Sequence, residues 1–478
     1  MQSGRGGSVP LMKKRRFFMK KFRLILLLFF ILSVRSGCFS QENVKLNKTI
    51  TLEDSVKITL QNSLDLQYSD QEIRKSEVRV NQAKTGGYPN VNASAYYTRM
   101  DPVQSFDVGG KTAELGSNNQ GQAKFTFNYS LYDGSKVTNQ VDQATMVSEA
   151  TRSDMDVTRQ NVIYKAIDSY YGVLRAYKLL DVAHDSLATT KEQYGISEAY
   201  YEEGLVAKSD VLSAKAQLAN VELGVISAES NVALKKAALN DTMTIPLNEN
   251  FELIDDLVYK PFPVDTDYST YLACANRGEA KKIMFLIKAA EAQIEVAKSD
   301  RKPTVTFNLD YIAFSSTFMN PSNSTNATFS ASIPIFDRGL TTCKIDEAEI
   351  TLAQAKTNLE QLKKALALQV TQAYLMLHES EEKVHKVKAN LESARQNYEV
   401  ARLRYQEGIA PFIEVSNAQL VLTNAEVDNV QALYDYYLAK ANMIKTTGLL
   451  PEDGKLDNIK LIKTGEEGSS EEELKNTK

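Results

Sequence analysis

Four short segments of the chain alternate between apolar and polar residues. In residues 304–311, Val305, Phe307 and Leu309 share one parity, whereas threonine, asparagine and aspartate occupy the other. The same alternation recurs in residues 91–98, 124–131 and 327–335. Because successive side chains of a strand point to opposite faces, each segment predicts a strand with one apolar face and one polar face.

The remaining segments combine helical periodicity with a scarcity of helix-breaking residues. Residues 340–407 contain neither glycine nor proline. A single helix over this range would be about 100 Å long, which is deeper than the core of a globular domain. Turns are expected at Gly204 and Gly408. The pattern predicts helices over residues 52–84, 136–203, 208–242, 267–299, 340–407 and 412–447.

The two halves of the chain repeat each other. Tyr201 aligns with Tyr405 at an offset of 204 positions, in a register that needs no gap over a long stretch. Upstream the offset is 214, as for Pro89 and Pro303, so an insertion must lie between residues 92 and 132. We therefore predict an internal duplication, in which each half contributes a helix, two strands, a very long helix and a further helix.

The N-terminal segment predicts export from the cytoplasm. Lysine and arginine crowd residues 13–23, and the apolar run 24–32 suits a signal peptide but is too short to cross a bilayer. The sequence is compatible with two alternative processing events. One is cleavage before Gln41, and the other is lipidation of Cys38 in a lipobox-like Ser-Gly-Cys sequence. No later segment has the unbroken apolar length of a transmembrane helix.

These features divide the chain into five segments. The expected divisions are a signal peptide over 1–40, a first repeat over 41–246, a linker over 247–263, a second repeat over 264–450 and an acidic, disordered tail over 451–478.

Composition argues against an enzyme and against a nucleic-acid-binding protein. Lys+Arg 56 and Asp+Glu 60 give a formal net charge of -4, without the basic surplus that nucleic acid requires. The cysteines are too widely spaced for a zinc or redox motif. The histidines, His184, His378 and His385, lie in predicted helices without metal-binding spacing. We expect no catalytic residue, no metal and no cofactor.

The predicted strands are too few to form a closed barrel within one chain. Closed membrane barrels begin at about eight strands, and an open sheet edge in lipid leaves backbone groups unpaired. The two-faced strands therefore predict that several copies share one transmembrane β-barrel, which the long helices continue as a water-filled tube. A half-buried sheet of a soluble protein and a non-conducting structural coiled coil of the envelope are the alternatives.

Several motifs carry a resemblance to a known family. They are TLEDSV at 51–56, a proline soon after the first helix of each half (Pro89 and Pro303), IPIFDRG at 333–339, and the turn sequences YEEG at 201–204 and RYQEG at 404–408. In this duplicated order, over about residues 50–450, the chain resembles the TolC-like outer membrane efflux proteins.

The resemblance implies a homotrimer in the outer membrane of a Gram-negative bacterium, embedded in lipid and extended by a periplasmic tunnel of helical hairpins. It implies passive conduction for a tripartite efflux or type I secretion system. The partners would be a periplasmic adaptor (membrane fusion) protein and an inner-membrane pump of the RND or ABC class. The exported cargo stays open among drugs, metal ions, other small molecules and polypeptides.

The resemblance also implies roles for the two helix turns. Adaptor-binding tips are implied at Gly204, Leu205, Val206, Ala207, Gly408, Ile409 and Ala410. The glycines would equally serve as left-handed helix ends. Ala410 departs from the family pattern, since many members carry a basic residue there.

A periplasmic gate is implied at Asp210, Tyr405, Glu414 and Asn417. Tyr405 and Asp210 match a hydrogen bond that closes neighbouring hairpins in the family. Glu414 matches an acidic constriction, whereas Asn417 replaces a frequent second acid. Copies of Glu414 around one axis would favour cations, and a solvated helix face is the alternative for this residue.

Overall fold

The computed structural model of the chain describes residues 49–103, 105–114, 118–254, 258–316 and 322–462. The expected signal peptide over 1–40, with the candidate lipidation site Cys38, lies outside these residues, as does the tail beyond 462. The described chain combines long helices with antiparallel strands, so the predicted mixed fold class is confirmed.

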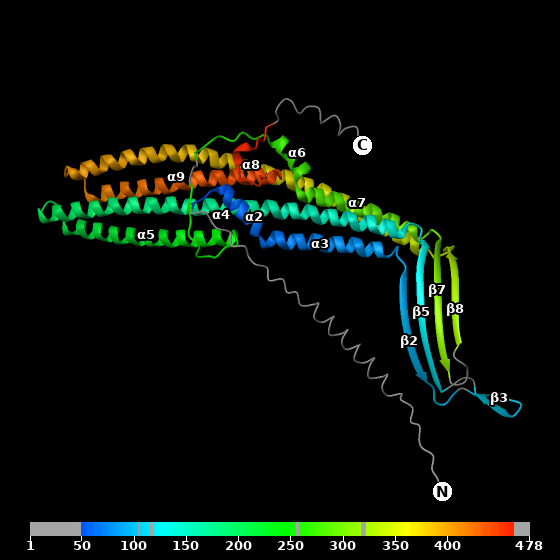
Figure 1. Ribbon diagram of the computed structural model, residues 1–478. Coiled ribbons are helices and arrows are strands. Elements are labelled where there is room, and N and C mark those ends of the chain that lie inside the picture. The colour runs from blue at the N-terminus through cyan, green and yellow to red at the C-terminus, as the bar shows by residue number, and fades with distance from the viewer. Residues whose placement is uncertain (1–48, 104, 115–117, 255–257, 317–321, 463–478) are drawn as a thin grey trace, which may run out of the picture. The chain divides into compact units, whose positions relative to one another are not determined.

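Long α-helices make up most of the described chain (Figure 1). They are α2 (Leu52–Asn62), α3 (Leu64–Thr85), α4 (Lys136–Glu202), α5 (Lys208–Thr242), α6 (Thr266–Asn276), α7 (Gly278–Ser299), α8 (Leu340–Gln406) and α9 (Phe412–Thr446), with a short 3-10 helix η1 (Leu456–Asn458). Helices α4 and α8 have 67 residues each, and α5 and α9 have 35 each. These four helices match the predicted ranges to within one residue at each end.

The predicted single helices over 52–84 and 267–299 are wrong in one respect, because each is broken near its start. Ser63 leaves the helical region at φ -54° and ψ 122°, and its side chain accepts a hydrogen bond from the Leu66 amide. A serine oxygen that caps a new helix offers the backbone an alternative to continuing the old one. Arg277 makes the equivalent break at φ -64° and ψ 134°.

One antiparallel sheet contains the four long strands in the order β2-β5-β7-β8. Their bounds are β2 (Asn90–Arg99), β5 (Asn119–Tyr132), β7 (Thr304–Ser316) and β8 (Ser322–Ser332). Strands β2 and β8 are the edges, so each has one side without a strand partner in this chain. The central strands β5 and β7 come from different halves of the sequence.

The register of the sheet keeps apolar residues on one face. Phe127 lies opposite Leu309, and Phe125 lies opposite Tyr311. The neighbouring positions pair polar residues, as for Thr126 opposite Asp310, where the threonine hydroxyl donates to the carboxylate at 2.7 Å. The predicted alternation of the strands is therefore present in three dimensions.

Two details near the strands differ from the prediction. Strand β8 ends at Ser332, before the expected Ile335. Pro334 lies two residues further along and has no amide hydrogen to donate to a ladder. A short hairpin of β3 (Ser105–Val108) and β4 (Lys111–Glu114) occupies the interval in which the two halves differ in length.

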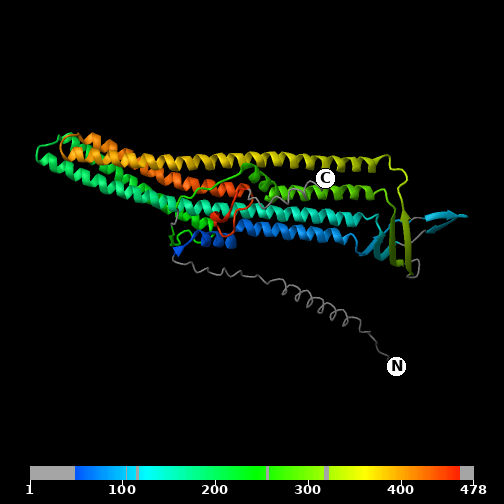
Figure 2. The same cartoon turned by 90° about the horizontal axis from the view of Figure 1, so that it is seen from above.

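The helices pack lengthwise around α4 and α8 (Figures 1 and 2). Helix α4 contacts α3, α5, α7 and α9, and α8 contacts α6, α7 and α9. Many buried positions carry alanine or serine, and Ser76 of α3 contacts Ser148 of α4 at 2.8 Å between hydroxyl oxygens. Small residues let helix axes approach closely and leave only thin buried stripes. Of the described helices, none is both long enough and apolar enough to cross a bilayer.

The linker between the two halves runs over the helices and is held there by hydrogen bonds. Strand β6 (Glu252–Leu253) pairs in parallel with β1 (Thr49–Ile50). The hydroxyl of Tyr436 donates to the Lys260 carbonyl, and the hydroxyl of Tyr437 donates to the Val258 carbonyl, both at 2.6 Å. The linker is thus fixed to α9 by two buried tyrosines.

Candidate functional site

The candidate site is built on the two turns that join α4 to α5 and α8 to α9. Gly204 and Gly408 adopt φ values of 77° and 70°, which favour glycine. The amide after each glycine donates back across the turn, from Leu205 to the Tyr200 carbonyl and from Ile409 to the Arg404 carbonyl, both at 2.8 Å. These bonds define a Schellman motif at the end of each long helix. The expected left-handed helix ends are confirmed.

The turns present apolar side chains to solvent. Leu205 is 67% exposed and Ile409 is 68% exposed. Val206 is half-buried and Ala207 is exposed, whereas Ala410 is buried. Of the residues expected to bind an adaptor, Ala410 therefore offers the least surface to a partner.

An apolar cluster beneath the turns joins the two hairpins. It is formed by residues of α5, α8 and α9: Ala214, Ala394, Tyr398, Ala401, Tyr405, Phe412, Val415, Ala418, Leu422 and Ala425. The ring of Tyr405 lies 5.9 Å from that of Phe412 and 5.9 Å from that of Tyr200 on α4. Burial of these rings holds the ends of the hairpins together.

Hydrogen bonds between the hairpins accompany this cluster. The amide of Gln193 on α4 donates to the Tyr398 hydroxyl and to the Gln419 carbonyl oxygen, each at 3.0 Å. The Tyr200 hydroxyl donates to the backbone carbonyl of Gln406 at 2.9 Å. Buried polar groups that satisfy one another in this way fix the relative positions of α4, α8 and α9.

Tyr405, an expected gate residue, is 4% exposed and has a partner within the chain. Its hydroxyl lies 2.9 Å from that of Ser197 on α4. Burial raises the pKa of Tyr405, the hydrogen bond with Ser197 lowers it, and the negative charge of Asp210 raises it further. Asp210 lies in the first turn of α5, near enough for its charge to act on this phenol.

The other two expected gate residues lie on α9 and differ in their surroundings. Glu414 forms an ion pair with Arg404, at 2.5 Å between Nη1 and Oε1. Asn417 is exposed one turn further along the helix. Sequence reasoning missed the partners Ser197, Gln193 and Arg404, because each contributes through a contact with another helix and no local pattern marks it.

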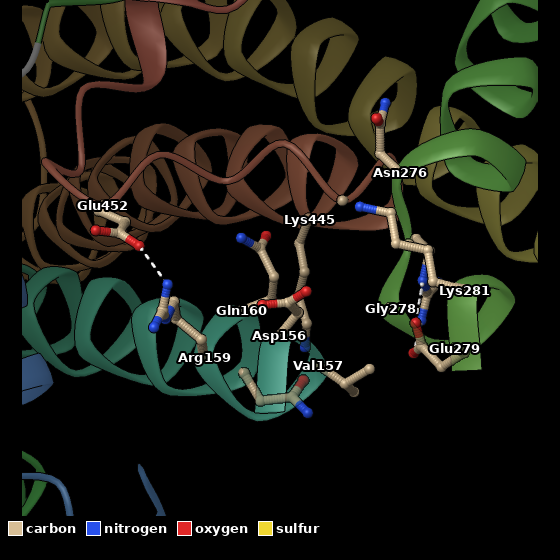
Figure 3. Close-up of a pocket in the computed structure, with 13 residues that line it drawn as sticks. Asp156, Val157, Arg159, Gln160, Asn276, Gly278, Glu279, Lys281, Lys445 and Glu452 are labelled. Atoms are coloured by element: carbon tan, nitrogen blue, oxygen red, sulfur yellow. Dashed lines mark hydrogen bonds and ion pairs between the residues drawn. The ribbon is translucent and has the colours of Figure 1, made fainter. Parts of the chain in front are cut away.

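A cavity of about 170 Å³ lies elsewhere, between α4, the start of α7 and the end of α9 (Figure 3). Arg159 pairs with Glu452 at 3.0 Å, and Arg277 pairs with Glu279. Burial and the nearby Arg277 charge lower the pKa of Lys445. Because most charges here are paired, the cavity is a polar junction between helices. Nowhere in the described chain do three or more histidine, cysteine or acidic side chains gather as a metal site.

Comparison with known proteins places this geometry in a family. The model of the outer membrane efflux protein family matches residues 56–243 and 271–449. Outer membrane efflux protein BepC of Brucella suis is 21% identical over 408 residues, which cover 84% of this chain and 86% of BepC. Outer membrane protein TolC of Escherichia coli is 23% identical over 423 residues, covering 80% of each chain.

Solved structures show the same fold. The outer membrane channel CmeC of Campylobacter jejuni superimposes with a TM-score of 0.70 at 17% identity, covering 89% of this chain and 88% of CmeC. The family match spans both halves and includes both helix turns. The chain therefore belongs to the outer membrane efflux protein family and is a protein of the Gram-negative outer membrane.

Proposed function

We propose that this protein is the outer-membrane channel subunit of a tripartite efflux or type I secretion system. It conducts substrates passively from a periplasmic adaptor and an inner-membrane pump of the RND or ABC class to the outside. The observation that carries this proposal is the four-stranded sheet, which has an apolar face, a polar face and two open edges.

The apolar face of the sheet is uncovered in the single chain. Val91 is 67% exposed and Phe329 is 72% exposed. Exposed aromatic and aliphatic rows that alternate with polar rows suit lipid on one side and water on the other. Open backbone edges do not persist in lipid. Pairing of β2 with β8 of the next copy would close the barrel, and a homotrimer is the assembly proposed here.

Equal element lengths support the proposed internal duplication. The pairs α2 and α6, α3 and α7, α4 and α8, and α5 and α9 have 11, 22, 67 and 35 residues respectively. The first repeat would span 41–246 and the second 264–450, joined by the linker 247–263. In the assembled trimer, the paired helical hairpins would form the periplasmic tunnel.

The hairpin turns form the proposed periplasmic end. The exposed apolar residues Leu205 and Ile409 would contact the adaptor, with Gly204, Val206, Ala207, Gly408 and Ala410 shaping the tips. Asp210, Tyr405, Glu414 and Asn417 would form the gate, in which Tyr405 of one hairpin bonds to Asp210 of its neighbour. The alternative is a non-conducting structural coiled coil of the envelope, which predicts no channel.

Reconstitution of the purified protein in planar bilayers tests the proposal. A detergent-extracted trimer that gives discrete conductance steps is the expected result. A monomer, or a trimer that never conducts even when the gate pair is removed by Tyr405→Phe with Asp210→Ala, would favour the coiled-coil alternative. Cysteine pairs across the β2 and β8 edges supply a second readout, since they should cross-link only between copies.

A further inference from the structure

The second hairpin carries an ion pair at the place where the gate is proposed. Arg404 lies in the last turn of α8 and Glu414 lies in the first turn of α9. Their side chains meet at 2.5 Å, and they are 47% and 36% exposed. The carboxylate of Glu414 is therefore paired with the guanidinium of Arg404 from the same chain.

The turn fixes the backbone on both sides of this pair. The Arg404 carbonyl accepts from the amides of Ile409 and Ala410, at 2.8 and 3.1 Å. The Glu414 amide donates to the Pro411 carbonyl at 3.0 Å. Glu414 is also the third residue of α9, where the helix dipole favours a negative charge. These hydrogen bonds hold the backbone of Arg404 and of Glu414 in positions from which the two side chains can form their ion pair.

The first hairpin supplies a contrasting arrangement. The residues 204 positions before Arg404 and Glu414 are Tyr200 and Asp210. Tyr200 is neutral, and its hydroxyl donates to the Gln406 carbonyl. Asp210 accepts a long hydrogen bond of 3.4 Å from Ser209 and forms no ion pair with any side chain of the described chain. The negative charge of Asp210 is thus not balanced by a neighbouring cation of the described chain, whereas the charge of Glu414 is balanced by Arg404.

We infer that Arg404 sets the ion selectivity of the proposed aperture. Arg404 cancels the charge of Glu414 within each chain, so Asp210 supplies the uncompensated carboxylate at the gate. This inference rests on the proposed channel function. An exposed ion pair stabilises little, but selectivity depends on the net charge near the pore axis and not on the strength of the pair. Around a trimer axis, three ion pairs favour cations far less than three bare carboxylates.

Reversal potentials in a KCl gradient test the inference in planar bilayers. Arg404→Gln should raise the cation-to-anion permeability ratio about two- to fourfold. This is the effect expected when each chain loses one positive charge close to the path of the ions in moderate salt. Glu414→Gln should lower the ratio, because it leaves Arg404 unpaired. The double variant Arg404→Gln with Glu414→Gln should return to the wild-type ratio.

Arg402→Gln is the matched control. It removes the same charge from the same helix, but residue 402 lies about 200° around the helix from residue 404. Arg402 pairs with Glu399 at 3.1 Å and not with α9. The control should leave the ratio unchanged. A conducting Arg404→Gln channel with the wild-type ratio, or an equal change in Arg402→Gln, would overturn the inference.

A second measurement does not depend on conduction. In a chain whose native cysteines are replaced by serine, Asn417→Cys places a thiol one turn from Glu414 on an exposed position. The ratio of its reaction rates with cationic and anionic methanethiosulfonates reports the local potential. Arg404→Gln should raise this ratio about two- to fourfold, and an unchanged ratio would overturn the inference. Absence of wild-type conductance, by contrast, would count against the proposed function alone.

Discussion

Lys440 on α9 forms an ion pair with Asp457 of η1, although the Lys440 side chain is only 2% exposed. Its ammonium also lies 4.9 Å from the ring centre of Phe262 in the linker. Asp457 binds a second cation, Lys260, at 2.7 Å. One carboxylate therefore ties the linker and the segment after α9 to the same point on the helices.

Loss of this carboxylate should cost more than loss of the lysine. Asp457→Asn leaves the buried Lys440 charge without its anion and should weaken the segment 456–461 by about 1–3 kcal/mol. Lys440→Met removes the charge at similar volume and should cost about 1 kcal/mol or less. Hydrogen exchange of the segment measures both effects. Equal losses in the two variants would contradict the assigned role of the buried charge.

The same carboxylate predicts a pH dependence. Hydrogen bonds from Lys260 and Lys440 hold the pKa of Asp457 below its ordinary value. A lowered folded-state pKa stabilises the fold above the ordinary pKa of about 4, and this contribution disappears as the pH falls through the lower folded value. The stability difference between wild type and Asp457→Asn should therefore shrink below about pH 4, as followed by thermal melts. A difference that grows in acid would exclude this assignment.

Gly278 at the start of α7 is expected to resist substitution. A Cβ built there would lie 2.8 Å from Cγ2 of Val157 and closer still to the Ser153 carbonyl oxygen of α4. Gly278→Ala should destabilise the protein by about 1–3 kcal/mol through this overpacking. Gly224→Ala is the control, since nothing lies within 4 Å of its added Cβ. In a helix interior, that change should stabilise by about 0.5–1 kcal/mol, and thermal unfolding distinguishes the two signs.

Adjacent residues of β7 test which face of the sheet meets lipid. Phe307 packs against Phe329 at 4.7 Å between ring centres, whereas Asn308 lies on the polar face opposite Asn128. Phe307→Lys should destabilise membrane assembly by about 2–4 kcal/mol, and Asn308→Lys should be tolerated. Folded trimer recovered from outer membranes measures the outcome. Tolerance of lysine at both positions would argue against the proposed orientation.

Much of this architecture is predictable because it is encoded locally. Helix α8 follows from the absence of glycine and proline, and α4 follows from the absence of proline. The glycines after them mark where both helices end, and the strands follow from strict alternation. The breaks at Ser63 and Arg277 are not predictable in this way, since the apolar period continues through both. Ser63 caps the new helix locally, whereas the break at Arg277 has no side-chain cap and accompanies the tight approach of Gly278 to α4.

The candidate site also has one part that the local sequence predicts and one part that it does not. The turns at Gly204 and Gly408 have a local signature in the sequence, because a left-handed residue must end each helix. The partners of the gate residues have none. Ser197 reaches Tyr405 from another hairpin, and the pairing of Arg404 with Glu414 depends on how the turn between them folds. Such side chains meet only when the chain is folded, so the sequence pattern around each of them does not predict the contact.

The hydroxyl of Tyr405 should serve two partners at once. A phenol can accept one hydrogen bond while it donates another. Ser197 can donate to it within the chain, which leaves the phenolic proton for Asp210 of the neighbouring hairpin in the proposed closed gate. Ser197→Ala should therefore cost about 1 kcal/mol of local stability at the tip and leave single-channel conductance unchanged.

Removal of the proposed link should instead open the channel. Tyr405→Phe combined with Asp210→Ala should raise single-channel conductance above that of wild type and of Ser197→Ala, because neighbouring hairpins lose the bond between Tyr405 and Asp210 and keep the apolar cluster beneath the turns. Tyr405→Phe retains the ring that packs against Phe412, so a gain in conductance would not reflect lost packing. Conductance equal to wild type in the double variant would mean that the Tyr405 hydroxyl serves only Ser197.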